Sequence, residues 1–226
     1  AESEGMLCAE DEVGLGSGHD GLFILPNDAI VGSSLSTLFP VYTDIVFEIG
    51  LTPNRSDAMS HWGVARDVCA YLSYHEGKQI EPIMPSLPSF DDSLPSNPIS
   101  ITIDQADACK RYCGIYISNV TVGNSPQWLK DRLQAIGQKS INNIVDITNY
   151  ILHDTGQPLH AFDADKISGK HVIVKYASKD EVFKTLDDKE RTLTENDLMI
   201  CNASSSICMA GVYGGIDSGV TINTKN

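Results

Sequence analysis

The hydrophobic and polar positions of this chain follow the period of β-strands in several stretches. Residues 44–50, DIVFEIG, and 171–177, HVIVKYA, are rich in β-branched and aromatic residues, and each predicts a strand. Residues 99–123 predict a strand, a short helix and a second strand. Residues 181–202 predict a hairpin that turns at Asp187–Asp188, followed by one more strand. The chain therefore contains a sheet.

Three other stretches have the spacing of helices. The first begins near residue 58, is capped by Ser56 or Asp57, and ends at a glycine. The second covers residues 125–137, opening on Ser-Pro and closing on Gly. The third covers residues 142–156. Its apolar residues fit the spacing of a buried helix better than the alternation of a strand, and Asn142 or Asn143 is expected to cap it.

A proline-rich stretch divides the chain. Residues 82–98 hold five prolines among serines and acids, which predicts a linker. Residues 1–40 read as short strands and loops, 41–81 as a small helical domain, and 99–226 as a mixed α/β domain. The fold class expected is α+β. Both ends read as the interior of folded segments, so we expect a piece of a longer protein.

The net charge and the composition of the chain disfavour several classes of function. The chain has 30 Asp and Glu against 16 Lys and Arg, a formal net charge of −14. Strong independent binding to nucleic acid is disfavoured, because phosphate neutralisation needs basic residues. The acidic start is unlike a signal or transit peptide, and no apolar run approaches the ~18–20 residues of a membrane span. Six cysteines without a CxxC predict reduced, mostly buried thiols in a cytoplasmic protein.

The stretch HDTGQPLHAFD contains the titratable residues of most interest. His153, Asp154, His160 and Asp163 are of the types that ligate zinc, but a site needs three or four convergent ligands. His153 and Asp154 also suit an ordinary helix end. No Ser or Cys nucleophile lies beside His160 in the sequence, so a catalytic and a structural role both remain open.

Two turns could approach a ligand. The glycines of AGVYGG, between two predicted strands, permit close approach to backbone amides, although the pattern is neither GxGxxG nor a phosphate loop. On the residues alone, a tight turn that joins two strands is the favoured explanation. Arg55, beside a helix start, could bind an anion or pair with an acid. Asp187 and Asp188 resemble paired carboxylates but fit a solvated hairpin tip.

Several stretches in order resemble one family. ESEGMLCAEDEVGL, VFEIGLTPNRSDAMSHWGVARDV, SINNIVDITNYILHDTGQPLHAFD and MAGVYGG are similar to the β subunit of bacterial phenylalanine–tRNA ligases. The resemblance implies the tail of an OB-fold tRNA-binding domain over 1–40 and a winged-helix-like domain over 41–81. It implies a C-terminally truncated editing domain over 99–226, with the acidic group that contacts tyrosine beyond Asn226.

The resemblance also implies which residues form the site. Thr148, Asn149 and His160 are expected to be catalytic, and Gly214 and Gly215 to bind substrate, with no metal in this part. The reaction implied is hydrolysis of tyrosyl-tRNA(Phe) formed in error. Ile216 and the stretch ASSSICMAG depart from the family pattern beside these glycines.

For the full enzyme, the resemblance implies ATP and magnesium as cofactors bound elsewhere, with none in this part. The expected partners are the α subunit, the rest of the β subunit and the 3′ end of tRNA(Phe), within a heterotetramer in the cytoplasm. Two other hypotheses stay open from the residues. One is a non-catalytic scaffold that positions tRNA, and the other is a metal hydrolase.

Overall fold

The computed structural model describes residues 5–16, 18–39, 42–87, 89 and 97–226. It divides into two compact units, Ala1–Val46 and Phe47–Asn226. In the described part of the first unit, the regular structure is a single 3-10 turn, Leu35–Thr37. The strands expected in residues 1–40 are therefore not present there, since glycine-rich and acidic segments lack a paired neighbour.

The second unit is α+β, as the sequence predicted. A five-stranded sheet has the order β1-β2-β5-β6-β7, in which β1 and β2 are parallel and the other pairs antiparallel. Its strands are β1 Ser100–Ile103, β2 His171–Tyr176, β5 Leu198–Cys201, β6 Ser206–Met209 and β7 Tyr213–Gly214. A separate hairpin consists of β3 Val182–Lys184 and β4 Glu190–Thr192, turning through Asp187 and Asp188 as expected.

The core lies on both faces of the sheet because strand residues alternate. On β5, Ile200 packs in one apolar cluster with Val172 and Cys208. Its neighbours Met199 and Cys201 pack in the opposite cluster. All six cysteines are free, as predicted, but only Cys201 and Cys208 are buried, so the prediction of mostly buried thiols is wrong. Burial raises the pKa of the Cys208 thiol to about 11, which keeps it protonated.

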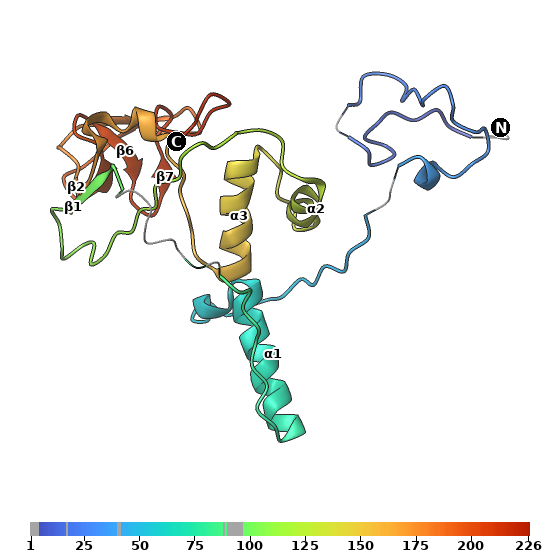
Figure 1. Cartoon of the computed structure of the whole chain (residues 1–226), viewed down its shortest axis with the longest axis horizontal. Helices are drawn as coiled ribbons and strands as arrows, with labels where there is room; N and C mark the ends of the chain where they lie inside the picture. Colours follow the sequence, from blue (N-terminus) through green and yellow to red (C-terminus); the bar gives the residue numbers. More distant parts are fainter. Residues whose placement is uncertain (1–4, 17, 40–41, 88, 90–96) are drawn as a thin grey trace. The chain divides into compact units, whose positions relative to one another are not determined.

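The helices are α1 His61–Glu76, α2 Gln127–Ala135 and α3 Asn143–Thr155. Helix α3 packs against both α1 and α2, and α2 and α3 are joined by a short connection (Figure 1). The predicted cap of α3 is confirmed: Asn142 accepts hydrogen bonds from the N–H groups of Ile144 and Val145, and Gly156 ends the helix in the left-handed conformation. None of the helices in the described residues is long and apolar enough to cross a bilayer.

Two helix starts differ from the prediction. Ser60, rather than Ser56 or Asp57, caps α1, because residues 56–58 form a separate 3-10 turn. Arg55 forms ion pairs with Asp57 at 3.0 Å and with Asp67 at 2.7 Å. Of the two roles considered for Arg55, pairing with an acid is therefore confirmed. Helix α2 begins at Gln127, one residue later than expected. Ser125, which was expected to cap it, has another role that is described below.

Three predicted elements of this part are wrong. Residues 44–50 form no strand and are exposed throughout. In residues 104–123 neither the short helix nor the second strand forms; a single turn over Gln105–Cys109 replaces the helix. Val120 makes one backbone bond, to the carbonyl of Lys225, but no ladder follows. A strand-like pattern without a neighbouring strand leaves the backbone groups unpaired, so it does not produce a strand. Residues 88 and 90–96 of the predicted linker lie outside the described residues.

A buried carboxylate fixes the start of α3. Asp146 has 0% exposed surface and accepts hydrogen bonds from the hydroxyls of Ser125 and Ser140, each at 2.5 Å, and from the N–H of Ile141 at 2.8 Å. Burial opposes ionisation, but these donors outweigh it and lower the pKa of Asp146. Ser125 therefore binds α3 rather than capping α2.

We expect Asp146→Ala to lower the free energy of unfolding by about 3 kcal/mol, because the buried carboxylate accepts three hydrogen bonds, one of them from the buried Ser125 hydroxyl. Because its folded pKa is lowered, Asp146 stabilises the fold above the ordinary carboxyl pKa, and this contribution is lost as pH falls through the lowered value. The parent–variant difference in denaturant unfolding should therefore shrink on acidification. Asp154→Asn, on the same helix, is the control. An equal loss in both variants would contradict a special role for Asp146.

Candidate active site

The site residues expected from the resemblance come from three segments. Thr148 and Asn149 lie on α3, and His160 lies on the extended segment that follows it. Gly214 ends β7 and Gly215 follows. Phe162, two residues after His160, pairs with Gly219 in an antiparallel bridge. This bridge brings the His160 segment alongside the chain that leaves β7, although more than 50 residues separate them in sequence.

His160 lies directly against Gly214. A Cβ atom at position 214 would collide with His160 Cε1 and would lie 3.0 Å from His160 Nε2. The other side of the ring meets Phe162 edge to face, with 4.5 Å between ring centroids. A glycine is therefore required at 214 for the imidazole to occupy this place.

The contacts of His160 affect its ionisation. Although the residue as a whole is exposed, its ring is flanked on two sides, and burial lowers the pKa of His160 below its ordinary value of about 6.5. The imidazole is consequently neutral at neutral pH and has one nitrogen able to accept a hydrogen bond. A neutral imidazole can orient a water molecule or take a proton from it.

The two glycines have different surroundings. A Cβ atom on Gly215 would lie 2.8 Å from the carbonyl oxygen of Ile207 and 2.9 Å from the Phe183 ring, which belongs to the core. Gly214 thus faces the imidazole, whereas Gly215 is confined by backbone and core. In the sequence the two glycines are equivalent, so the motif cannot tell which of them faces the imidazole and which faces the core.

Leu186 was not anticipated from the sequence. Its N–H donates to the carbonyl of Gly214 at 3.0 Å, and its side chain lies beside both Gly214 and Gly219. It is 49% exposed, so it offers an apolar surface next to His160. No spacing rule could have selected it, because the hairpin that carries it reaches β7 only through tertiary pairing.

Thr148 and Asn149 are not joined to His160 by contacts within the described residues. The Thr148 hydroxyl donates to the Val145 carbonyl of its own helix at 2.7 Å. Within the same residues, no protein group hydrogen-bonds the Asn149 amide, which is half-buried. The structure therefore places His160 against Gly214 and shows no hydrogen bond from Thr148 or Asn149 to His160 among the described residues.

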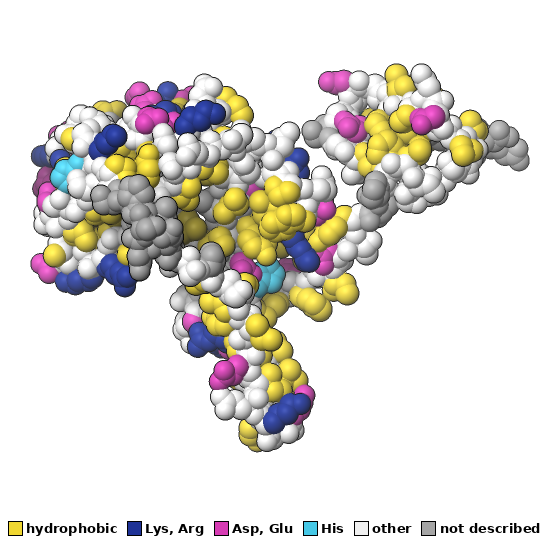
Figure 2. Space-filling view, in the orientation of Figure 1, with side chains coloured by type: hydrophobic (Ala, Val, Ile, Leu, Met, Phe, Trp, Pro, Cys, Tyr) yellow, Lys and Arg dark blue, Asp and Glu magenta, His cyan; other side chains and the backbone are white. Residues whose placement is uncertain are grey.

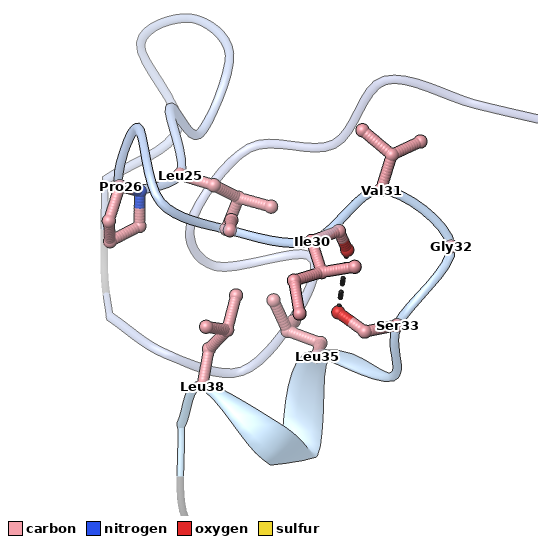
Figure 3. A pocket seen from close by; sticks show the side chains of 9 residues that line it. Leu25, Pro26, Ile30, Val31, Gly32, Ser33, Leu35 and Leu38 are labelled. Carbon is pink, nitrogen blue, oxygen red and sulfur yellow. Dashed lines mark hydrogen bonds between the residues drawn. The ribbon is translucent and has the colours of Figure 1, made fainter.

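Two hollows among the described residues illustrate the surface, and His160 lines neither of them. One, of about 480 Å³, lies in the first unit and is apolar, with Leu25, Ile30, Leu35 and Leu38 around it (Figure 3). The other, of about 450 Å³, is lined by polar residues and borders Gly215. Among the described residues, no group of three His, Cys, Asp or Glu could hold a metal ion, so His153, Asp154, His160 and Asp163 are not gathered.

Comparison with known proteins defines the class first. The family model of the B3/4 domain matches residues 108–226. The chain belongs to the B3/4 domain family.

The curated relatives then identify the kind of protein that it resembles. A phenylalanine–tRNA ligase β subunit of Bacteroides fragilis is 51% identical over 225 residues, which is 100% of this chain and 27% of that protein. Those of Porphyromonas gingivalis and Geobacter metallireducens are 49% and 42% identical over 226 residues, with the same coverage. The resemblance to this family, and to subunits named as aminoacyl-tRNA ligases, is confirmed. The chain spans about a quarter of these relatives.

A solved structure of an N-terminal fragment of the phenylalanyl-tRNA synthetase β subunit from Pyrococcus horikoshii is similar at a TM-score of 0.39. It has 18% identity and covers 76% of this chain and 50% of the fragment. At this level nothing about the site follows from it.

We expect Gly215→Ala to affect mainly the stability of the fold and Gly214→Ala to affect mainly the pKa of His160. Alanine at 215 meets a backbone carbonyl and should lower the free energy of unfolding by about 2 kcal/mol, because the backbone cannot yield cheaply. Alanine at 214 meets the imidazole, which can rotate away, so the fold should lose less while the pKa of His160 rises towards its ordinary value.

Thermal unfolding measures the first effect. Hydrogen exchange at imidazole C2, followed by mass spectrometry across pH, measures the second. An unchanged His160 exchange profile in Gly214→Ala would show that the two residues do not touch in solution.

Proposed function

We propose that this chain is part of a phenylalanine–tRNA ligase β subunit and hydrolyses tyrosyl-tRNA(Phe) formed in error. The observation that carries the proposal is the neutral imidazole of His160 held against Gly214, in a chain that is 51% identical over its length to such a subunit. The full enzyme would attach phenylalanine to tRNA in the cytoplasm as a heterotetramer with an α subunit. ATP and magnesium would act in parts outside this chain.

The need for a second site follows from chemistry. Phenylalanine and tyrosine differ by one hydroxyl, and an apolar synthetic pocket rejects an added hydroxyl only about 100-fold. An editing site can instead require that hydroxyl, because a buried partner left unpaired penalises phenylalanine. The exposed Leu186 beside Gly214 would supply apolar contact for the tyrosine ring.

Hydrolysis of an activated ester needs a positioned water more than a strong base. In the proposal, His160 orients this water, and Gly214 leaves the room that the imidazole needs to hold this position. Asn149 and Thr148 would meet the terminal adenosine, and the unpaired amide of Asn149 is available for this contact. A ribose hydroxyl of the substrate would assist.

The alternative is a non-catalytic module that positions tRNA. The absence of a hydrogen bond from Thr148 or Asn149 to His160, among the described residues, favours this alternative. The two functions differ in one measurable quantity, the rate at which tyrosyl-tRNA is deacylated.

We expect His160→Ala, in the full-length β subunit with its partner subunit, to lower kcat/KM for tyrosyl-tRNA deacylation about 100-fold. Aminoacylation with phenylalanine should stay within about twofold, because that chemistry lies elsewhere. His153→Ala is the matched histidine control, since its side chain lies at the end of α3. Equal deacylation rates in the parent and the His160 variant would favour the scaffold.

The charge of the chain leads to a separate expectation. Residues 1–98 contain three Lys and Arg against 15 Asp and Glu, whereas residues 99–226 contain 13 against 15. Residues 1–46 contain no Lys or Arg, and the visible face of this unit shows acidic and hydrophobic side chains without basic ones (Figure 2). The OB-fold-like unit of the proposal therefore lacks cations for phosphate contacts.

We expect the 226-residue chain to bind tRNA with a dissociation constant weaker than about 10 µM at physiological salt. Asp20→Asn with Asp28→Asn should strengthen binding slightly, because two repelling charges are removed. Fluorescence anisotropy at several salt concentrations measures both. Tight binding that these variants leave unaltered would contradict the electrostatic argument.

A further inference from the structure

His160 lies on a segment with little support of its own. The four residues 157–160 are all exposed, and their backbones belong to no strand. An exposed segment of this kind retains conformational freedom, which costs about 1–2 kcal/mol per residue to remove. The imidazole can stay against Gly214 only if the chain on one side of it is held.

Asp163 holds that chain. It is only 6% exposed, and its N–H donates to the carbonyl of Ser218 at 3.1 Å. Its Oδ2 accepts from the Thr224 hydroxyl at 2.7 Å, and its Oδ1 accepts from the N–H of Asp165 at 3.1 Å. Both carboxylate oxygens and the backbone therefore have partners, and two of the three partners come from the C-terminal segment.

Ser218 and Thr224 extend these contacts. The Ser218 hydroxyl, on a residue only 2% exposed, lies 3.0 Å from the carbonyl oxygen of Ile207 and 3.4 Å from that of Gly215. Ser218 therefore links Asp163 to the residue directly after Gly214. Thr224, 4% exposed, accepts from the N–H of Thr221 at 2.9 Å while it donates to Asp163.

We propose that Asp163, Ser218 and Thr224, together the Asp163 clamp, are positioning residues that hold His160 against Gly214. The effect of the clamp on catalysis rests on the proposed function. Its effect on the position of His160 does not depend on that function. The clamp fixes the register of the pairing between Phe162 and Gly219, and a slip of one residue would turn neighbouring side chains to the opposite face. His160, two residues before Phe162, would then leave the glycine.

The clamp is tested first through the imidazole itself. Thr224→Val keeps the shape of the side chain but removes the hydroxyl, and Thr224→Ser restores it. Asp163→Asn weakens the acceptor, and Asp165→Asn is the matched control, because Asp165 contributes only its N–H. Exchange at imidazole C2 is followed in the full-length protein with its partner subunit. We expect Thr224→Val and Asp163→Asn to raise the pKa of His160 towards its ordinary value, and Thr224→Ser and Asp165→Asn to match the parent.

The second readout is tyrosyl-tRNA deacylation. We expect Thr224→Val to lower kcat about 10-fold with KM within about twofold, because the substrate still binds while the water is misplaced. A general loss of structure would instead lower phenylalanine attachment as well. If Thr224→Val does not fold, Asp163→Asn against Asp165→Asn gives the same comparison.

The outcomes are distinguishable. Unchanged His160 exchange in Asp163→Asn and Thr224→Val, when Gly214→Ala does shift it, overturns the clamp. A shift of the His160 exchange profile in Asp163→Asn and Thr224→Val supports the clamp. A shifted profile together with normal deacylation in His160→Ala supports the clamp as a structural device and overturns the proposed function.

Discussion

The close contact between an imidazole and a residue without a side chain is the constraint on which the candidate site depends. Gly214 leaves room for the ring of His160, and Leu186 pairs with the backbone of the same glycine. The contact excludes water from part of the ring, and this lowers the pKa of His160 and keeps it neutral. The position and the protonation state of the imidazole thus both depend on one absent Cβ atom.

Buried carboxylates orient the second unit where apolar burial is scarce. Helix α1 buries only Gly63, and many hydrophobic side chains in the second unit remain exposed. Asp146 gathers donors from the segments that flank α2 and so sets the start of α3. Asp163 does the same between the His160 segment and the C-terminal residues. Hydrogen bonds to carboxylates are directional, so they define one arrangement where a few apolar contacts would tolerate several.

The elements predicted correctly are those whose signals are local. Helix α3 carries its own cap in Asn142 and its own stop in Gly156, and both act within one turn of the helix. Strand β2 alternates and is central to the sheet. Residues 44–50 have equally strong strand composition but no partner, and β-propensity is expressed only on a paired, half-buried surface. The hairpin at Asp187–Asp188 forms because its two strands are adjacent in sequence.

The sequence by itself determined the α+β class, the family resemblance, and the pairing of His160 with a glycine turn as the place to look. Only the tertiary structure decided that Gly214 faces the imidazole while Gly215 faces the core, and that Asp163 reaches Thr224 rather than a metal. The reason is physical: residue types and short-range periods report local conformation, whereas the direction of a Cβ atom and the partner of a buried carboxylate depend on how distant strands are registered.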